Sequence, residues 1–195
     1  ENISNDNFKF RDSRKMFVAG VPAIVNRISF TGELGYEIYV APHFQLKLYE
    51  ELNEAGKEFN IKPFGARALM SMRLEKNWGA WTLDYRPDFT AKETGLDSFI
   101  YWDKDFIGKD SAQNDESTNK LVPLIVETNE IDVTNNEAVL KGGKSIGYIT
   151  SGGFAHFVNK SVAFSYINQN EIKSEKNIQV EINGDLFNCS IIKEP

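Results

Sequence analysis

The residues best suited to bind a ligand lie in two places, a glycine-bent strand entry and the start of a helical run. Glu37 follows Gly35 and Tyr36 at the head of an apolar strand pattern, and Arg67 follows Gly65 where helical spacing begins. A carboxylate accepts two hydrogen bonds side by side, which suits the amino-pyrimidine edge of a pterin ring. A guanidinium in the first turn of a helix is repelled by the positive end of the helix dipole. Arg67 therefore needs a compensating anion, for which a ligand carboxylate is one candidate.

Both residues also have a simpler interpretation. A strand glutamate such as Glu37 is most often solvated or paired with a cation. An arginine near a helix start, such as Arg67, is most often met by solvent or by a nearby carboxylate in a weak surface pair. Residue types alone favour these simpler interpretations. Arg73 and Glu75, farther along the same run, are most simply structural.

Other residue patterns do not support a catalytic or metal site. Ser151–Gly153 lies at a predicted turn without the Lys-Ser/Thr ending or the following helix of a phosphate loop. His43 and His156 have no Cys, Asp or second His at ligand spacing and no nucleophile signature nearby, so we predict neither a metal site nor hydrolase chemistry. Cys189 is the single cysteine and lies in a strand-like alternation, which favours a packed thiol over a reactive one.

Length and composition limit the class of protein. The chain has 195 residues, of which 41% are hydrophobic, enough for one or two ordinary cores. A net charge of -6 without clustered Lys and Arg argues against nucleic acid and anionic membranes as partners. No apolar run approaches the ~20 residues of a membrane helix, so we expect a soluble, cytoplasmic protein. Because the chain starts at Glu1 in a polar stretch, we expect a piece that begins mid-protein.

The N-terminal pattern is mixed. Two β-prone runs, 16–18 and 23–25, predict a hairpin around Gly20, and 36–40 predicts a strand. Pro42 precedes a helical pattern carried by Phe44, Leu48, Leu52 and Ala55, and a second helix is predicted from about Gly65 to Asn77. Short connections between these strands favour an α+β fold.

The C-terminal pattern is different. Residues 78–109 are aromatic-rich and irregular, and the polar tract 110–120 is a predicted linker. Short alternating runs separated by Gly or Asn turns then predict a small β-barrel. The expected strands are 121–127, 138–140, 145–150, 161–166, 178–182 and 187–192.

A set of short motifs occurs in order along nearly the whole chain. Each motif alone is weak evidence for a family, but their order and spacing make the set specific. Their ranges are 30–37 (FTGELGYE), 65–67 (GAR), 72–76 (MRLEK), 94–97 (TGLD), 105–109 (DFIGK), 147–153 (GYITSGG) and 160–163 (KSVA). The set resembles the aminomethyltransferase (glycine-cleavage T-protein) family. Segments 73–81 and 191–195 look most like the C-terminal half of dimethylglycine and sarcosine dehydrogenases.

The resemblance implies an α+β fold with a partial aminomethyltransferase-type α/β folate-binding domain over 1–109, a linker over 110–120 and a C-terminal β-barrel over 121–195. It implies a tetrahydrofolate site in which Glu37 holds the pteridine edge, Arg67 meets the acidic side of the folate and Phe30 lines the pocket. The position of Phe30 is commonly a tyrosine in T-proteins, and a pocket tryptophan falls near Ser98 or Phe99. The first departure removes a hydroxyl hydrogen bond, and the second favours the dehydrogenase branch.

The resemblance assigns no catalytic residue to this chain, because the key aspartate of the family lies in an N-terminal half that is absent. FAD is expected only in a missing N-terminal domain, since no Gly-x-Gly-x-x-Gly follows a strand here. The implied function is the folate-binding portion of a flavoprotein that demethylates a small methylated amine and passes the one-carbon unit to tetrahydrofolate. The missing N-terminal half is the expected partner. A T-protein, a folate-dependent demethylase of methylated sulfur compounds, and a noncatalytic folate-binding module remain alternatives.

Overall fold

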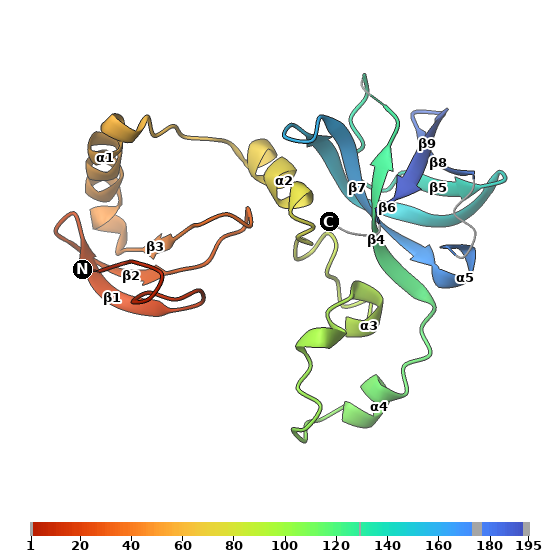
Figure 1. Cartoon of the computed structure of the whole chain (residues 1–195), viewed down its shortest axis with the longest axis horizontal. Helices are drawn as coiled ribbons and strands as arrows, with labels where there is room; N and C mark the ends of the chain where they lie inside the picture. The colour runs from red at the N-terminus through yellow and green to blue at the C-terminus, as the bar shows by residue number, and fades with distance from the viewer. Residues whose placement is uncertain (1, 129, 173–176, 193–195) are drawn as a thin grey trace. The chain divides into compact units, whose positions relative to one another are not determined.

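The computed structural model describes residues 2–128, 130–172 and 177–192. Two compact units divide the chain, one through Leu69 and the other from Met70 onward. Figure 1 shows a small sheet with a helix in the N-terminal unit and a barrel in the C-terminal unit. The predicted division into residues 1–109, 110–120 and 121–195 stays a prediction. Each unit is described separately below.

The first unit is built on a three-stranded antiparallel sheet. Its strands β1 (Ser13–Val18), β2 (Val21–Asn26) and β3 (Glu37–Tyr39) pair in the order β1-β2-β3. Ala19 and Gly20 form the tight β1–β2 turn with positive φ angles of 49° and 74°, which glycine adopts at no steric cost. The predicted hairpin at Gly20 and the predicted strand around Glu37 are therefore confirmed.

Strand register separates the two faces of this sheet. Met16 pairs with Ala23 and Val25 pairs with Ile38 on one face, where they pack with the fully buried Phe8. Residues directly opposite each other in antiparallel strands share a face, so the alternate residues form the other face. Exposed apolar side chains lie on this other face, with Phe17 72%, Ile24 42% and Tyr39 54% exposed.

Helices follow the sheet in the chain. Segments η1 (Pro42–Phe44), α1 (Gln45–Gly56) and η2 (Lys57–Phe59) lie in the first unit, and α2 spans Ala66–Glu75. Both predicted helices are thus present. Leu48 is buried, whereas Leu52, on the same predicted apolar stripe, is 36% exposed. A side chain at Gly56 would overlap Ile61, so the chain turns closely back on the end of α1.

The aromatic-rich region contains short helices joined by turns. These are α3 (Ala91–Thr94), η3 (Asp97–Phe99) and α4 (Lys109–Gln113), the last of which overlaps the predicted linker. Thr90 and Glu93 cap α3 reciprocally, since each side chain accepts a hydrogen bond from the backbone N–H of the other. Asn119 at the start of the next strand donates to Glu93 at 3.1 Å, which ties α3 to the barrel.

The second unit ends in the predicted barrel, which closes in the order β4-β7-β6-β5-β8-β9 (Figure 1). Leu124, Ile149, Ile167 and Val180 are fully buried in its core. A short helix, α5 (Gln169–Ile172), follows β7. The strands are β4 (Asn119–Val126), β5 (Ala138–Lys141), β6 (Lys144–Ala155), β7 (Lys160–Asn168), β8 (Ile178–Ile182) and β9 (Asp185–Ile191).

One local prediction in the barrel is wrong. Ser151–Gly153 does not form a turn but continues β6, which runs on to Ala155. Gly152 permits this path because a Cβ there would lie 2.8 Å from the Cγ1 and carbonyl oxygen of Val133. Gly152 therefore serves close packing against Val133. Cys189 is buried on β9, as expected for a packed thiol.

Candidate functional site

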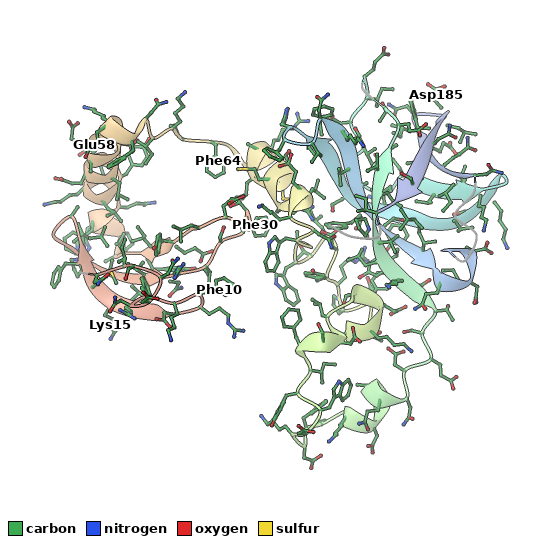
Figure 2. All side chains as sticks on the ribbon, in the orientation of Figure 1. Phe10, Lys15, Phe30, Glu58, Phe64 and Asp185 are labelled. Carbon is green, nitrogen blue, oxygen red and sulfur yellow. The ribbon has the colours of Figure 1, made fainter. Side chains whose placement is uncertain are left out.

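The loop between β2 and β3 carries the first candidate residue and is folded tightly on itself. A Cβ at Gly35 would lie 2.9 Å from the Cβ of Ser29, so only glycine allows this approach without a shift. The hydroxyls of Ser29 and Thr31 are hydrogen-bonded at 3.0 Å on either side of Phe30. Phe30 is 40% exposed and projects from this loop (Figure 2). Its ring is thus available to a ligand or a partner.

Glu37 begins β3, and its side chain lies on the sheet face opposite to the core. The core contacts of Tyr36 and Ile38 establish this, because neighbouring residues of a strand point to opposite faces. Glu37 is half-buried and accepts a hydrogen bond of 2.5 Å from the Tyr39 hydroxyl. That hydrogen bond raises the pKa of Tyr39 above its ordinary value, with a further contribution from the carboxylate charge.

Arg67 occupies the first turn of α2, as the sequence predicts, and its side chain is exposed. The helix begins at Ala66 with no acidic residue in its first turn. An anion near this helix start would be stabilised by both the guanidinium and the helix dipole. Phe30, Glu37 and Arg67 all precede Leu69, the last residue of the first unit, and α2 continues across that boundary. A pocket that joins all three residues remains a prediction.

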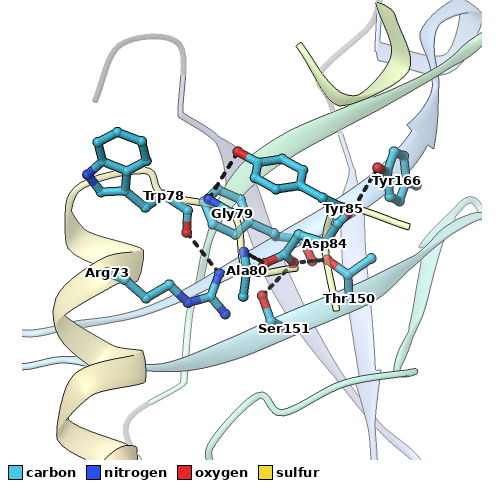
Figure 3. A network of polar contacts seen from close by, with 10 residues as sticks. Arg73, Trp78, Gly79, Ala80, Asp84, Tyr85, Thr150, Ser151 and Tyr166 are labelled. Carbon is cyan, nitrogen blue, oxygen red and sulfur yellow. Dashed lines mark hydrogen bonds and ion pairs between the residues drawn. The ribbon is translucent and has the colours of Figure 1, made fainter. Parts of the chain in front are cut away.

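A buried polar cluster at α2 was not predicted. Asp84 accepts hydrogen bonds from Arg73 at 2.6 Å and the Ala80 backbone N–H at 2.7 Å through Oδ2. Its Oδ1 accepts from Ser151 at 2.6 Å and also from Thr150 (Figure 3). The Tyr166 hydroxyl donates to the backbone carbonyl of Asp84 at 2.7 Å.

This cluster anchors α2 and the following loop to the barrel. Arg73 and Asp84 are both fully buried, and Arg73 also donates to the carbonyl of Trp78 at 3.0 Å. Burial lowers the pKa of Arg73, and the Asp84 charge opposes that shift, so the ion pair keeps the guanidinium charged. Both oxygens of the Asp84 carboxylate accept hydrogen bonds from protein groups among the described residues. The chemistry of the cluster is therefore structural, in agreement with the expectation for Arg73.

No helix within 2–128, 130–172 and 177–192 is long and apolar enough to cross a membrane. Over the same ranges, no group of three or more His, Cys, Asp or Glu side chains is placed to hold a metal ion.

A small antiparallel sheet with an outward-facing glutamate, followed by helices and a closed six-stranded barrel, defines an α+β protein of the aminomethyltransferase-like fold. The crystal structure of glycine cleavage system aminomethyltransferase T from Bartonella henselae has this fold, with a TM-score of 0.81 at 22% identity over 95% of this chain and 52% of that one. Residues 1–104 match the family described as the GCVT N-terminal domain, and residues 119–195 match the glycine cleavage T-protein C-terminal barrel domain. The chain belongs to the glycine cleavage T-protein family.

Two kinds of curated relative are similar to this chain. Human mitochondrial dimethylglycine dehydrogenase is 35% identical over 200 residues, covering 100% of this chain and 23% of the relative. The aminomethyltransferase of Pseudothermotoga lettingae is 34% identical over 180 residues, covering 91% of this chain and 49% of the relative. The chain thus spans about a quarter of the first relative and about half of the second.

Proposed function

We propose that this chain forms the folate-binding portion of a dimethylglycine/sarcosine dehydrogenase-like enzyme, which transfers a one-carbon unit from an N-methylated amino acid to tetrahydrofolate. Membership in a family of folate-dependent aminomethyltransferases supports the transfer to folate. The match of the whole chain to dimethylglycine dehydrogenase supports the finer assignment. A T-protein-like aminomethyltransferase is the second candidate, because those relatives have nearly the same identity.

The observation that carries the proposal is the position of Glu37. Its carboxylate faces away from the sheet core, is half-buried, and accepts a hydrogen bond from the neutral phenol of Tyr39, so it retains further lone pairs for a ligand. A carboxylate in such a place fits the two adjacent N–H groups of a pteridine edge. Bound tetrahydrofolate would supply the nitrogen that accepts the one-carbon unit.

The protein residues then have orienting roles. Glu37 would hold the pteridine edge, Arg67 would attract the acidic side of the folate, and Phe30 would cover part of the ring. Holding the acceptor in one orientation is itself a large source of rate acceleration. No proton transfer is assigned to these residues.

The partner in this proposal is the part of the enzyme that corresponds to the uncovered length of the relatives, including any FAD domain. The open sheet face supports a partner of this kind, because Phe17, Ile24 and Tyr39 expose apolar surface around a groove of about 560 Å³. Contiguous apolar surface of this kind marks an interaction site. The cytoplasmic location stays a prediction, while the human relative is named as mitochondrial.

Calorimetric titration of the purified protein with tetrahydrofolate tests the folate site. Glu37→Gln removes the charge from the proposed bidentate contact, so we expect its affinity to fall by about 1.5 to 3 kcal/mol. Glu50→Gln on the exposed surface of α1 is the matched control and should bind like the parent protein. Absence of binding, or equal binding by Glu37→Gln, would refute the pocket assignment.

Turnover assays separate the candidate activities. Oxidation of dimethylglycine or sarcosine with formation of a folate-bound one-carbon unit supports the dehydrogenase. Folate-dependent release of ammonia from an aminomethyl donor supports a T-protein. Demethylation of a methylated sulfur compound supports a folate-dependent demethylase. Folate binding without any turnover in the full-length gene product identifies a noncatalytic module.

A further inference from the structure

Asn26 lies directly opposite Glu37 in the strand ladder. The register of β2 and β3 pairs Asn26 with Glu37, Val25 with Ile38 and Ile24 with Tyr39. Directly opposed residues of antiparallel strands share a face and have Cβ atoms about 4.5 to 5.5 Å apart. Asn26 therefore presents its amide beside the Glu37 carboxylate, on the sheet face that does not contact the core.

The amide of Asn26 has an unused acceptor. Its Oδ1 is enclosed, yet none of the groups within the described ranges donates a hydrogen bond to it. An enclosed amide oxygen without a donor is unfavourable, and such atoms in folded proteins are few enough to require an explanation. Ser13, which pairs with Asn26 on the side away from Glu37, is not hydrogen-bonded to this oxygen either.

The neighbouring carboxylate is already oriented. Tyr39 donates its hydroxyl hydrogen to Oε2 of Glu37 at 2.5 Å, along the strand rather than across it. The two strands thus place an acceptor-only carboxylate next to an amide with an open acceptor. A planar ligand edge with three neighbouring N–H groups would satisfy both side chains.

We propose that Asn26 is a second pteridine-binding residue, which accepts the amino N–H that Glu37 leaves unbonded. This inference rests on the proposed folate site. The exocyclic amino group of a pteridine carries two N–H donors, and the adjacent ring nitrogen carries a third. Glu37 takes the ring N–H and one amino N–H in a bidentate contact, and Asn26 Oδ1 takes the second amino N–H.

The assignment makes Asn26 a specificity residue for the amino group. A ligand without that group would leave Asn26 Oδ1 unpaired, as in the free protein, and would gain nothing from the asparagine. A site built to pair with a particular N–H group discriminates strongly against an analogue that lacks it.

A cycle of two ligands and two proteins tests this contact by calorimetry. The ligands are tetrahydrofolate and 2-desamino-2-methyl-tetrahydrofolate, and the proteins are the parent and Asn26→Ala. We expect Asn26→Ala to weaken tetrahydrofolate binding about five- to tenfold and to leave binding of the desamino analogue unchanged. Ser13→Ala, on the same face but beyond Asn26, should bind both ligands like the parent. Far-UV circular dichroism and thermal unfolding check that each variant is folded.

The outcomes separate this inference from the folate site itself. Equal tetrahydrofolate binding by the parent and Asn26→Ala, with weakened binding by Glu37→Gln, overturns the role of Asn26 and leaves the site intact. An equal loss of affinity for both ligands in Asn26→Ala also overturns it, because the effect of the asparagine would then not depend on the amino group. If Glu37→Gln binds tetrahydrofolate as tightly as the parent, or if the parent binds neither ligand, the proposed folate site is refuted and this inference is refuted with it.

Discussion

Arg73 and Asp84 form an ion pair that solvent does not reach. Nη1 of Arg73 lies 2.6 Å from Oδ2 of Asp84, and both side chains have an exposed fraction of 0%. The guanidinium also lies 5.5 Å from the centre of the Phe164 ring, on the barrel strand β7. The pair thus connects α2 with the loop after it and with the barrel (Figure 3).

Replacing Asp84 with Asn should strongly destabilise the second unit. The substitution leaves the Arg73 charge buried without its carboxylate, and breaking a buried pair in this way costs about 3 to 5 kcal/mol. Urea unfolding followed by circular dichroism measures the loss. Asp88→Asn is the control, because Asp88 pairs with Arg86 at an exposed position and should lose no more than about 1 kcal/mol. Similar losses in the two variants would contradict the anchoring role.

Local patterns were enough to predict most of the strands and helices. The barrel strands have alternating apolar residues bounded by glycine or asparagine turns, and β8 has the predicted bounds Ile178–Ile182. The prediction of a turn at Ser151–Gly153 is wrong because glycine more often marks a turn, whereas here Gly152 makes room for Val133. That reason lies in a tertiary contact, so no local pattern could show it.

The site was predictable only in part. The outward position of Glu37 follows from alternation along the strand, but its neighbour Asn26 depends on the register between β2 and β3. A sequence does not show register directly, because the intervening loop is ten residues long by the bounds of the two strands. The Arg73–Asp84 pair was missed for a similar reason, since it depends on the path of an irregular loop.

Cys189 should react slowly with thiol reagents in the folded protein. Burial raises the pKa of its thiol to about 12, with a further contribution from Glu127, so the thiolate is scarce at pH 8. We expect labelling by Ellman's reagent at least about a hundredfold slower than in urea-unfolded protein. Labelling as fast as in the unfolded chain would contradict the buried position.

The Cys189 thiol should also make the folded protein less stable as pH rises above 9. The folded pKa of about 12 exceeds the ordinary value of 9.0, so the contribution of the neutral thiol is complete below pH 9 and is lost as pH rises toward 12. Urea midpoints of the parent should therefore fall more steeply over this interval than those of Cys189→Ala. Parallel pH profiles would show that Cys189 is not the group responsible.

Gly147 should not tolerate a side chain, whereas Gly153 on the same strand should. A Cβ at Gly147 would overlap the backbone carbonyl oxygen of Tyr166 on the paired strand, and a backbone atom cannot move aside cheaply. Gly147→Ala should lose about 1 to 3 kcal/mol of unfolding free energy. At Gly153 the nearest atom is Leu74 Cδ1 at 3.7 Å, an ordinary contact, so Gly153→Ala should stay within about 0.5 kcal/mol of the parent. Equal urea midpoints for the two variants would refute the register of β6 and β7.

The hydrogen bond between Tyr39 and Glu37 can be measured without a ligand. The pKa of the Tyr39 hydroxyl is raised because its proton is shared with the Glu37 carboxylate, and because a negative charge nearby disfavours the phenolate. Glu37→Gln removes the charge and weakens the hydrogen bond, so the Tyr39 pKa should fall toward 10.0. NMR titration of protein with ¹³C-labelled tyrosine, assigned with Tyr39→Phe, reports this value directly. Glu50→Gln should leave the Tyr39 pKa unchanged, since Glu50 lies on α1. A Tyr39 pKa that is the same in the parent and in Glu37→Gln would mean that this phenol does not orient the carboxylate, and the orientation of Glu37 would then depend on the ligand alone.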